Sequence, residues 1–175
     1  LFAGIQQRVK EGRWEFAGSS FVELDKNLPN LESMARHILY TKEYLQEKFD
    51  IPYEKVNLDF HPDSFGHSPS VPEILNAGGI RYFYHCRGLD DVHLYRWRGD
   101  SGAEVLALNE PLWYNDQMRP MYLHIVPQFC YQYGVQDMMK IYGVGDHGGG
   151  PTEENIRAGE TLRPAFDEGE LRALC

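Results

Sequence analysis

The sequence predicts an α/β fold, with a parallel sheet or a barrel-like (β/α) arrangement in which strands alternate with helices. Three segments carry this prediction. An apolar run at residues 56–60 is typical of a short buried strand. A polar turn and a helix at about residues 69–76 follow it, and an apolar, aromatic run at residues 80–86 indicates the next strand. Strand, helix and strand in this order are typical of a βαβ unit, whose two strands are parallel.

The segment before this unit predicts an extended stretch and then a long helix. Residues 13–24 are expected to be extended, with an interruption at Gly18. Asn30 is a suitable N-cap for a helix that runs to about Phe49, where Asp50-Ile51-Pro52 ends it. Its apolar positions recur near the 3.6-residue period of a helix, at Leu31, Met34, Ala35, Ile38, Leu45 and Phe49.

The second half of the chain predicts a hairpin and further helices. Residues 93–97 and 104–108 flank a turn sequence, Gly99-Asp100-Ser101-Gly102, and should pair as a hairpin. A helix is expected at residues 121–133, kinked at Pro127, and a strand at residues 138–142. A glycine-rich turn at residues 143–151 should lead into a helix capped by Thr152.

Composition and charge restrict the classes of partner. The 175 residues carry a net charge of −9, which makes a phosphate backbone and hence nucleic acid an improbable partner. The longest apolar runs fall far short of the roughly 20 residues of a membrane helix. A cytoplasmic location is the expectation, although the chain begins at Leu1 in polar sequence, where a signal peptide would not be visible. The sequence does not predict an oligomeric state.

Two turns combine an aspartate with a histidine at positions where α/β folds place reactive groups. The first is His61-Pro62-Asp63-Ser64-Phe65-Gly66-His67-Ser68, directly after a predicted strand. Pro62 fixes the backbone before Asp63, and a carboxylate held in this way can meet a metal ion or a substrate carbon. In the alternative interpretation, Asp63 caps the next helix and the two histidines make ordinary hydrogen bonds.

The second turn is Gly143-Val144-Gly145-Asp146-His147-Gly148-Gly149-Gly150-Pro151-Thr152. Five glycines in ten residues indicate positive φ angles or a close approach of the backbone to another group. The turn lacks the GK[ST] of a phosphate loop and the GxGxxG of a dinucleotide site, and Asp146 would repel phosphate. A plain flexible turn is the alternative. A third polar stretch, residues 18–29, carries Glu23 and Asp25 two residues apart, so that both would share one face of a strand, and a solvated loop that enters a helix is the alternative interpretation.

Two carboxylates on separate turns after strands are suited to glycoside hydrolysis. In retaining enzymes, one carboxylate acts as the nucleophile and the other as general acid and then general base. The two acids need different environments, so that one is ionised while the other holds a proton.

Three ordered motifs resemble glycoside hydrolase family 38, the zinc-dependent α-mannosidases, and especially its bacterial branch. GRWEFAGSSFVELDKNLPNLESMARH is similar to the family's first conserved stretch. HPDSFGHSPSVPEILNAGGIRYFYHCRG is similar to the block that holds the nucleophile, and GVGDHGGGPT to a glycine-rich signature of that branch. The resemblance covers about residues 13–165, and it implies that residues 1–175 are part of one catalytic domain, truncated at both ends.

The resemblance also implies site residues and a cofactor. In the family, a zinc ion binds two histidines and two aspartates, and one of these aspartates is also the nucleophile. By resemblance that residue is Asp63, which would be the only zinc ligand in this chain, because the others are expected upstream and downstream of it. His61 and His67 are not implied as ligands. The aspartate of the glycine-rich signature corresponds to Asp146, the candidate acid/base.

The activity implied is retaining hydrolysis of terminal α-mannosides, with α-mannoside oligosaccharides as substrates. Two alternatives remain open. The chain is another metal-dependent hydrolase on an α/β scaffold, or it is an inactive or weakly sugar-binding fragment. If the family interpretation holds, Asp63 lies at the carboxyl end of the strand at residues 56–60, and Asp63 and Asp146 face one cleft.

Overall fold

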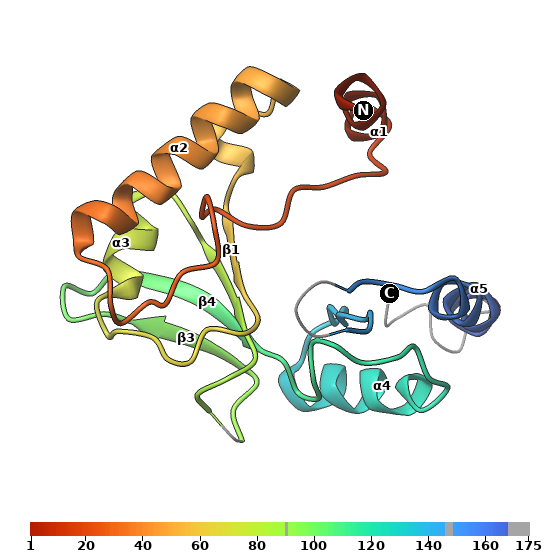
Figure 1. Cartoon of the computed structure of the whole chain (residues 1–175). Coiled ribbons are helices and arrows are strands. Elements are labelled where there is room, and N and C mark those ends of the chain that lie inside the picture. Colours follow the sequence, from red (N-terminus) through yellow and green to blue (C-terminus); the bar gives the residue numbers. More distant parts are fainter. Residues whose placement is uncertain (90, 146–148, 168–175) are drawn as a thin grey trace. The chain divides into compact units, whose positions relative to one another are not determined.

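The structure is a computed structural model that describes residues 1–89, 91–145 and 149–167. The chain divides into two compact units, Leu1–Pro111 and Leu112–Cys175. Figure 1 shows the helices and strands of both units in chain order. Within the described ranges, no helix has both the length and the apolar character that crossing a membrane requires.

A four-stranded mixed sheet forms the centre of the first unit. Its strands are β1 (Leu58–His61), β2 (Tyr82–His85), β3 (Leu94–Arg98) and β4 (Glu104–Asn109), in the order β1-β2-β4-β3. β1, β2 and β4 are parallel, whereas β3 pairs antiparallel with β4 as the predicted hairpin. The α/β class is therefore confirmed. Among the described residues the sheet is open, and the barrel alternative finds no support there.

Two helices cover one face of this sheet, as Figure 1 shows. α3 (Val71–Ala77) connects β1 to β2 and completes the predicted βαβ unit. α2 (Leu31–Phe49) begins after Asn30, whose side-chain Oδ1 accepts a hydrogen bond from the Ser33 amide at 2.9 Å, so the predicted N-cap is confirmed. The core between helices and sheet consists of small and medium apolar side chains: Ile38, Val71, Leu75, Ile80, Phe83, Val105 and Ala107.

A second apolar cluster holds the amino-terminal segment against the end of α2. α1 (Phe2–Lys10) was not predicted from the sequence. The ring of Phe49 lies 5.6 Å from that of Phe2 and 4.7 Å from that of Phe16, between centroids. The short helix η1 (Tyr53–Lys55) follows α2 and leads into β1. Contacts distant in sequence therefore stabilise α1, which has no buried residue of its own.

The second unit is helical. α4 (Tyr122–Tyr133) continues through Pro127, and its buried side chains are Tyr122, Val126, Phe129 and Cys130. α5 (Glu153–Asp167) starts after Thr152, whose hydroxyl accepts a hydrogen bond from the Asn155 amide at 3.1 Å. The Asn155 side-chain oxygen accepts in return from the Thr152 amide at 3.2 Å, which gives a reciprocal cap at the predicted position.

The strand predicted at residues 138–142 is wrong, because these residues form no strand. Other groups of the second unit hold this segment in an irregular path. The Lys140 ammonium donates to the Trp113 carbonyl at 2.7 Å, and the Gly143 amide donates to the Asp116 carbonyl at 2.8 Å. An apolar run forms a strand only where a neighbouring strand can complete its hydrogen bonds, and the described part of this unit contains no such strand.

Candidate active site

Asp63 lies on the turn that follows β1, as predicted. β1 ends at His61, and Pro62 and Asp63 form a bend that leads away from the carboxyl end of the sheet. The Asp63 side chain is 38% exposed, so water or a ligand can reach it. Ligands of open α/β sheets bind beyond the carboxyl ends of the strands, which is where this carboxylate lies.

Arg87 orients the Asp63 carboxylate from the neighbouring strand. Its Nε and Nη2 atoms both donate to Asp63 Oδ1, at 2.8 Å and 2.6 Å. The parallel register pairs His61 with His85, and Asp63 and Arg87 each lie two residues beyond these partners. The guanidinium also lies 4.7 Å from the centre of the exposed Phe65 ring. Two donors from one planar group converge on Oδ1 and hold this oxygen in place.

The segment before α2 supplies a second carboxylate to the same turn. The Asp63 amide donates to Glu23 Oε1 at 2.9 Å. The next residues of the two segments are also hydrogen-bonded: the Ser64 hydroxyl donates to the Leu24 carbonyl at 3.0 Å. Of the two acids that the sequence singled out in this stretch, Glu23 contacts the turn, whereas Asp25 accepts a hydrogen bond from the Asn27 amide at 2.7 Å.

A buried charge cluster lies next to the turn, centred on Asp59 of β1. The Asp59 side chain has no exposed surface, and Lys26 Nζ lies 2.6 Å from its Oδ2. Its Oδ1 accepts hydrogen bonds from the hydroxyls of Ser19 at 2.8 Å and Ser20 at 3.1 Å, and lies 3.2 Å from His61 Nε2. Burial by itself raises the pKa of Asp59, but the hydrogen bond from His61 and the charge of Lys26 outweigh it and hold that pKa well below its usual range.

The two histidines of the turn are largely buried and pack against neighbouring side chains. His61 is buried, and its ring nitrogens lie 3.2 Å from the hydroxyls of Ser64 and Ser20. The His67 ring packs edge-on against Phe83, with a centroid distance of 5.0 Å, and also contacts His85. Burial, together with the charges of neighbouring groups, lowers the pKa of His67 to about 4, so its ring is neutral at pH 7.

A zinc ion would find one suitable carboxylate here and no complete site. Aspartate oxygen is an ordinary zinc ligand, and Asp63 is accessible. Within the described ranges, however, no three His, Cys, Asp or Glu side chains are grouped closely enough to hold a metal ion. Since a zinc site needs at least three protein ligands, the described residues supply one expected ligand but do not form the site.

The candidate acid/base, Asp146, lies outside the described residues, and so do His147 and Gly148. The prediction that Asp63 and Asp146 face one cleft therefore stays a prediction. The ends of this turn are described, and Val144 and Gly150 exchange two backbone hydrogen bonds across it, at 3.0 Å and 2.8 Å. Gly143 and Gly145 have φ angles of 139° and 108°, and a Cβ at Gly149 would collide with the Val144 carbonyl. Closure of the turn therefore accounts for at least three of its glycines.

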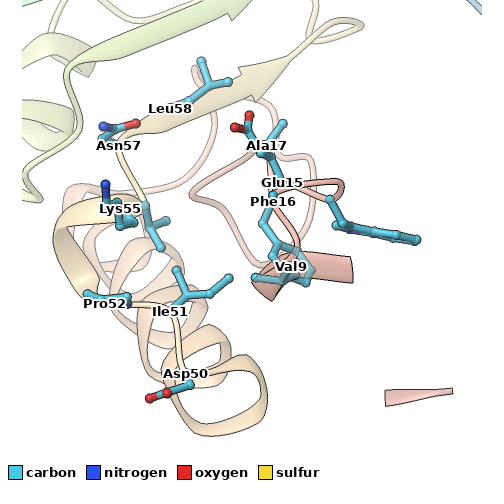
Figure 2. Close-up of a pocket in the computed structure, with 13 residues that line it drawn as sticks. Val9, Glu15, Phe16, Ala17, Asp50, Ile51, Pro52, Lys55, Asn57 and Leu58 are labelled. Carbon is cyan, nitrogen blue, oxygen red and sulfur yellow. The ribbon is translucent and has the colours of Figure 1, made fainter. Parts of the chain in front are cut away.

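A pocket at the opposite end of β1 is not part of this site. Figure 2 shows this pocket, with a volume of about 500 Å³, lined in part by Phe16, Ile51, Lys55 and Leu58. Leu58 is the first residue of β1, whereas Asp63 follows the last one. The pocket thus lies at the amino end of the strand, away from the end where α/β folds place their chemistry.

Comparisons with known proteins identify the family of this chain. Residues 1–165 match the family model described as the glycosyl hydrolases family 38 N-terminal domain. The chain therefore belongs to glycoside hydrolase family 38.

Relatives with curated names include Alpha-mannosidase G of Dictyostelium discoideum, 30% identical over 162 residues. Alpha-mannosidase of Saccharomyces cerevisiae is 25% identical over 169 residues, and Alpha-mannosidase 2C1 of Homo sapiens is 28% identical over 178 residues. These alignments cover 87% to 89% of this chain but only 14% to 15% of the relatives' length. The assignment to a bacterial branch stays a prediction.

Sequence reasoning missed Arg87 and the contact made by Glu23. A signal for Arg87 is present in the sequence, because it follows its strand at the same offset as Asp63 follows β1. Reading that signal requires knowing that the two strands are adjacent, parallel and in this register. The contact between Glu23 and the turn joins residues 40 positions apart and has no periodic signature.

Proposed function

We propose that this chain is an internal part of the catalytic domain of a zinc-dependent α-mannosidase, truncated at both ends. The reaction is retaining hydrolysis of terminal α-mannosides, and the substrates are α-mannoside oligosaccharides. The observation that carries the proposal is the accessible Asp63 carboxylate, which Arg87 orients beyond the carboxyl end of a parallel strand. Family membership and the names of the relatives support the reaction class.

In this proposal Asp63 is the nucleophile. Its carboxylate attacks the anomeric carbon and forms a covalent glycosyl-enzyme, while a general acid protonates the leaving oxygen. Asp146 is the proposed acid, and after departure of the leaving group it removes a proton from the water that releases mannose. Arg87 holds Oδ1, so that the direction of the carboxylate is set before the sugar arrives.

Asp63 is also proposed as one ligand of a zinc ion, with the remaining ligands outside the described residues. When bound, zinc supplies Lewis-acid contacts to sugar hydroxyls. His61 and His67 are not proposed as ligands: the His61 ring nitrogens lie at hydrogen-bond distance from serine hydroxyls, and the His67 ring packs against Phe83.

Two alternatives to this proposal stay open. A lone carboxylate ligand favours a fragment that is inactive or binds sugar weakly when it is isolated. Another metal-dependent hydrolase would use the same Asp63 turn on a different substrate. A cytoplasmic location and the absence of nucleic-acid partners stay predictions from composition.

The test uses the full-length natural protein that contains this sequence. It should hydrolyse aryl α-mannosides far faster than aryl α-glucosides or β-mannosides, and α-mannose should be the first-formed product. A mannosyl fluoride with a second fluorine on the ring, which slows release of the intermediate, should label Asp63 covalently, as found by mass spectrometry of the peptides. Label on another residue, or β-mannose as the first product, would refute the proposed role of Asp63.

Azide tests the role of Asp146. With an activated leaving group, Asp146→Ala should form the intermediate normally but hydrolyse it slowly, and azide should restore turnover and yield α-mannosyl azide. A fast Asp146→Ala enzyme with no response to azide would remove Asp146 from the mechanism.

A further inference from the structure

We propose that Glu23 is a positioning residue for the nucleophile, acting through its hydrogen bond to the Asp63 backbone. The inference rests on the proposed function, because it deepens the role of the same turn. Its starting point is the 2.9 Å contact between the Asp63 amide and Glu23 Oε1. The Glu23 carboxylate contacts the backbone of Asp63 and so holds the position of the Asp63 backbone. Arg87 contacts the Asp63 carboxylate and so holds the far end of that side chain.

The contact is one of several between two parallel segments. The Glu23 carboxylate accepts from the Asp63 amide, and the Leu24 carbonyl accepts from the Ser64 hydroxyl. Further along the two segments, Lys26 forms a parallel backbone bridge with His67. Gly66 fits into the same interface, because a Cβ there would lie 2.5 Å from the Asn27 side chain. The two segments therefore lie closely packed along their length.

Glu23 belongs to a segment that is itself fixed. Lys26 is 3% exposed and forms an ion pair with the buried Asp59, and Ser19 and Ser20 donate hydrogen bonds to the same carboxylate. The segment from Ser19 to Lys26 is thus anchored at both ends in the sheet, and Glu23 lies between the anchors. The backbone that carries Glu23 is therefore held beside the turn, and the exposed Glu23 side chain reaches the Asp63 amide from there.

The turn lies beyond the hydrogen-bonded ladder of the sheet, and Glu23 supplies an acceptor for its backbone. β1 ends at His61, and the bend at Pro62 and Asp63 lies beyond the sheet ladder. A hydrogen bond from an amide to a carboxylate is charge-assisted and stronger than one to water. Its loss would leave the Asp63 amide to solvent and let the turn sample other positions. A displacement of about 1 Å at a reacting atom lowers rates by about a hundredfold.

The experiment compares three variants of the full-length natural protein on an activated aryl α-mannoside. Glu23→Ala removes the acceptor, and kcat/KM and the rate of covalent labelling at Asp63 should both fall by about tenfold to a hundredfold. Glu23→Gln keeps an oxygen acceptor of the same length and should stay within about threefold of the wild type. Glu32→Ala is the matched control, since Glu32 is an exposed acid of the same unit, paired only with Arg36 among the contacts described for it, and should change nothing.

Thermal denaturation separates positioning from folding. Glu23 is exposed, so Glu23→Ala should unfold within about 2 °C of the wild type. A wild-type labelling rate in Glu23→Ala would overturn the inference and leave the proposed function standing. Failure of Glu23→Gln to restore the rate would overturn it as well, because the charge and not the acceptor would then be required. A full-length wild-type protein without mannosidase activity would overturn both.

Discussion

Replacing Lys26 with methionine tests whether the buried pair with Asp59 holds the turn region together. The substitution keeps the length of the side chain but leaves a carboxylate without exposed surface and without its cation. The hydroxyls of Ser19 and Ser20 still reach Oδ1, whereas Oδ2 faces the position of the lost ammonium. Breaking a buried pair in this way costs about 3–5 kcal/mol of unfolding free energy.

The assay is urea denaturation of the natural protein, followed by tryptophan fluorescence. Two controls make the result specific. Arg36→Ala breaks an exposed pair with Glu32 and should cost less than about 1 kcal/mol. The double variant Lys26→Met with Asp59→Leu removes both charges and should recover part of the lost stability, because no buried charge is left unpaired, although the hydroxyls of Ser19 and Ser20 lose their acceptor. A loss below about 1 kcal/mol in Lys26→Met alone would refute the reasoning.

Three further predictions concern pH, a helix cap and the site. The pKa of His67 is about 4 in the folded chain and near 6.5 in the unfolded chain, so the unfolding free energy should fall as pH drops from about 6.5 to 4. In His67→Gln, denaturation curves at several pH values should show a smaller fall of the unfolding free energy over this range. Asn30→Ala removes the acceptor for the Ser33 amide and should lower the unfolding free energy by about 1 kcal/mol. Arg87→Met should reduce kcat/KM and the rate of labelling at Asp63 by roughly tenfold or more. Arg87→Lys should recover only part of the lost rate, because an ammonium group lacks the two coplanar N–H donors of a guanidinium.

Each of these predictions has an outcome that contradicts it. If His67→Gln has the same pH dependence of stability as the wild type, other groups cause the loss of stability in acid. Asp59 is one such group, and it acts below about pH 4, because its pKa in the folded chain is held below the usual value. Full stability of Asn30→Ala would mean that packing alone determines where α2 begins. Equal activity of Arg87→Lys and wild type would show that a point charge is sufficient beside Asp63.

Local signals in the sequence were enough to predict most helices and strands. The cap at Asn30 and the apolar run of β2 act over a few residues, and the structure has both of them. The exceptions depend on partners elsewhere in the chain. α1 lies against Phe49, nearly forty residues beyond it, and the apolar run at residues 138–142 lacks a neighbouring strand within the described part of its unit.

The candidate site was predictable only in part. Asp63 follows a recognisable strand and could be placed on its turn from the sequence. The polar groups around it could not, because Glu23 and Arg87 reach it from positions 40 and 24 residues away. The buried pair of Lys26 and Asp59 was also missed, since a lysine and an aspartate in a sequence are usually solvated side chains.

The parallel register of β1 and β2 makes the site tolerant of changes in chain length. Asp63 and Arg87 meet because each lies two residues past the paired residues His61 and His85. An insertion in the loop around Gly78 would lengthen the connection without moving either strand end, and the two side chains would still meet. One residue inserted between His85 and Arg87 would carry the guanidinium away and turn it to the other face. The number of residues separating them can therefore drift among relatives, while the offset from each strand end is under constraint.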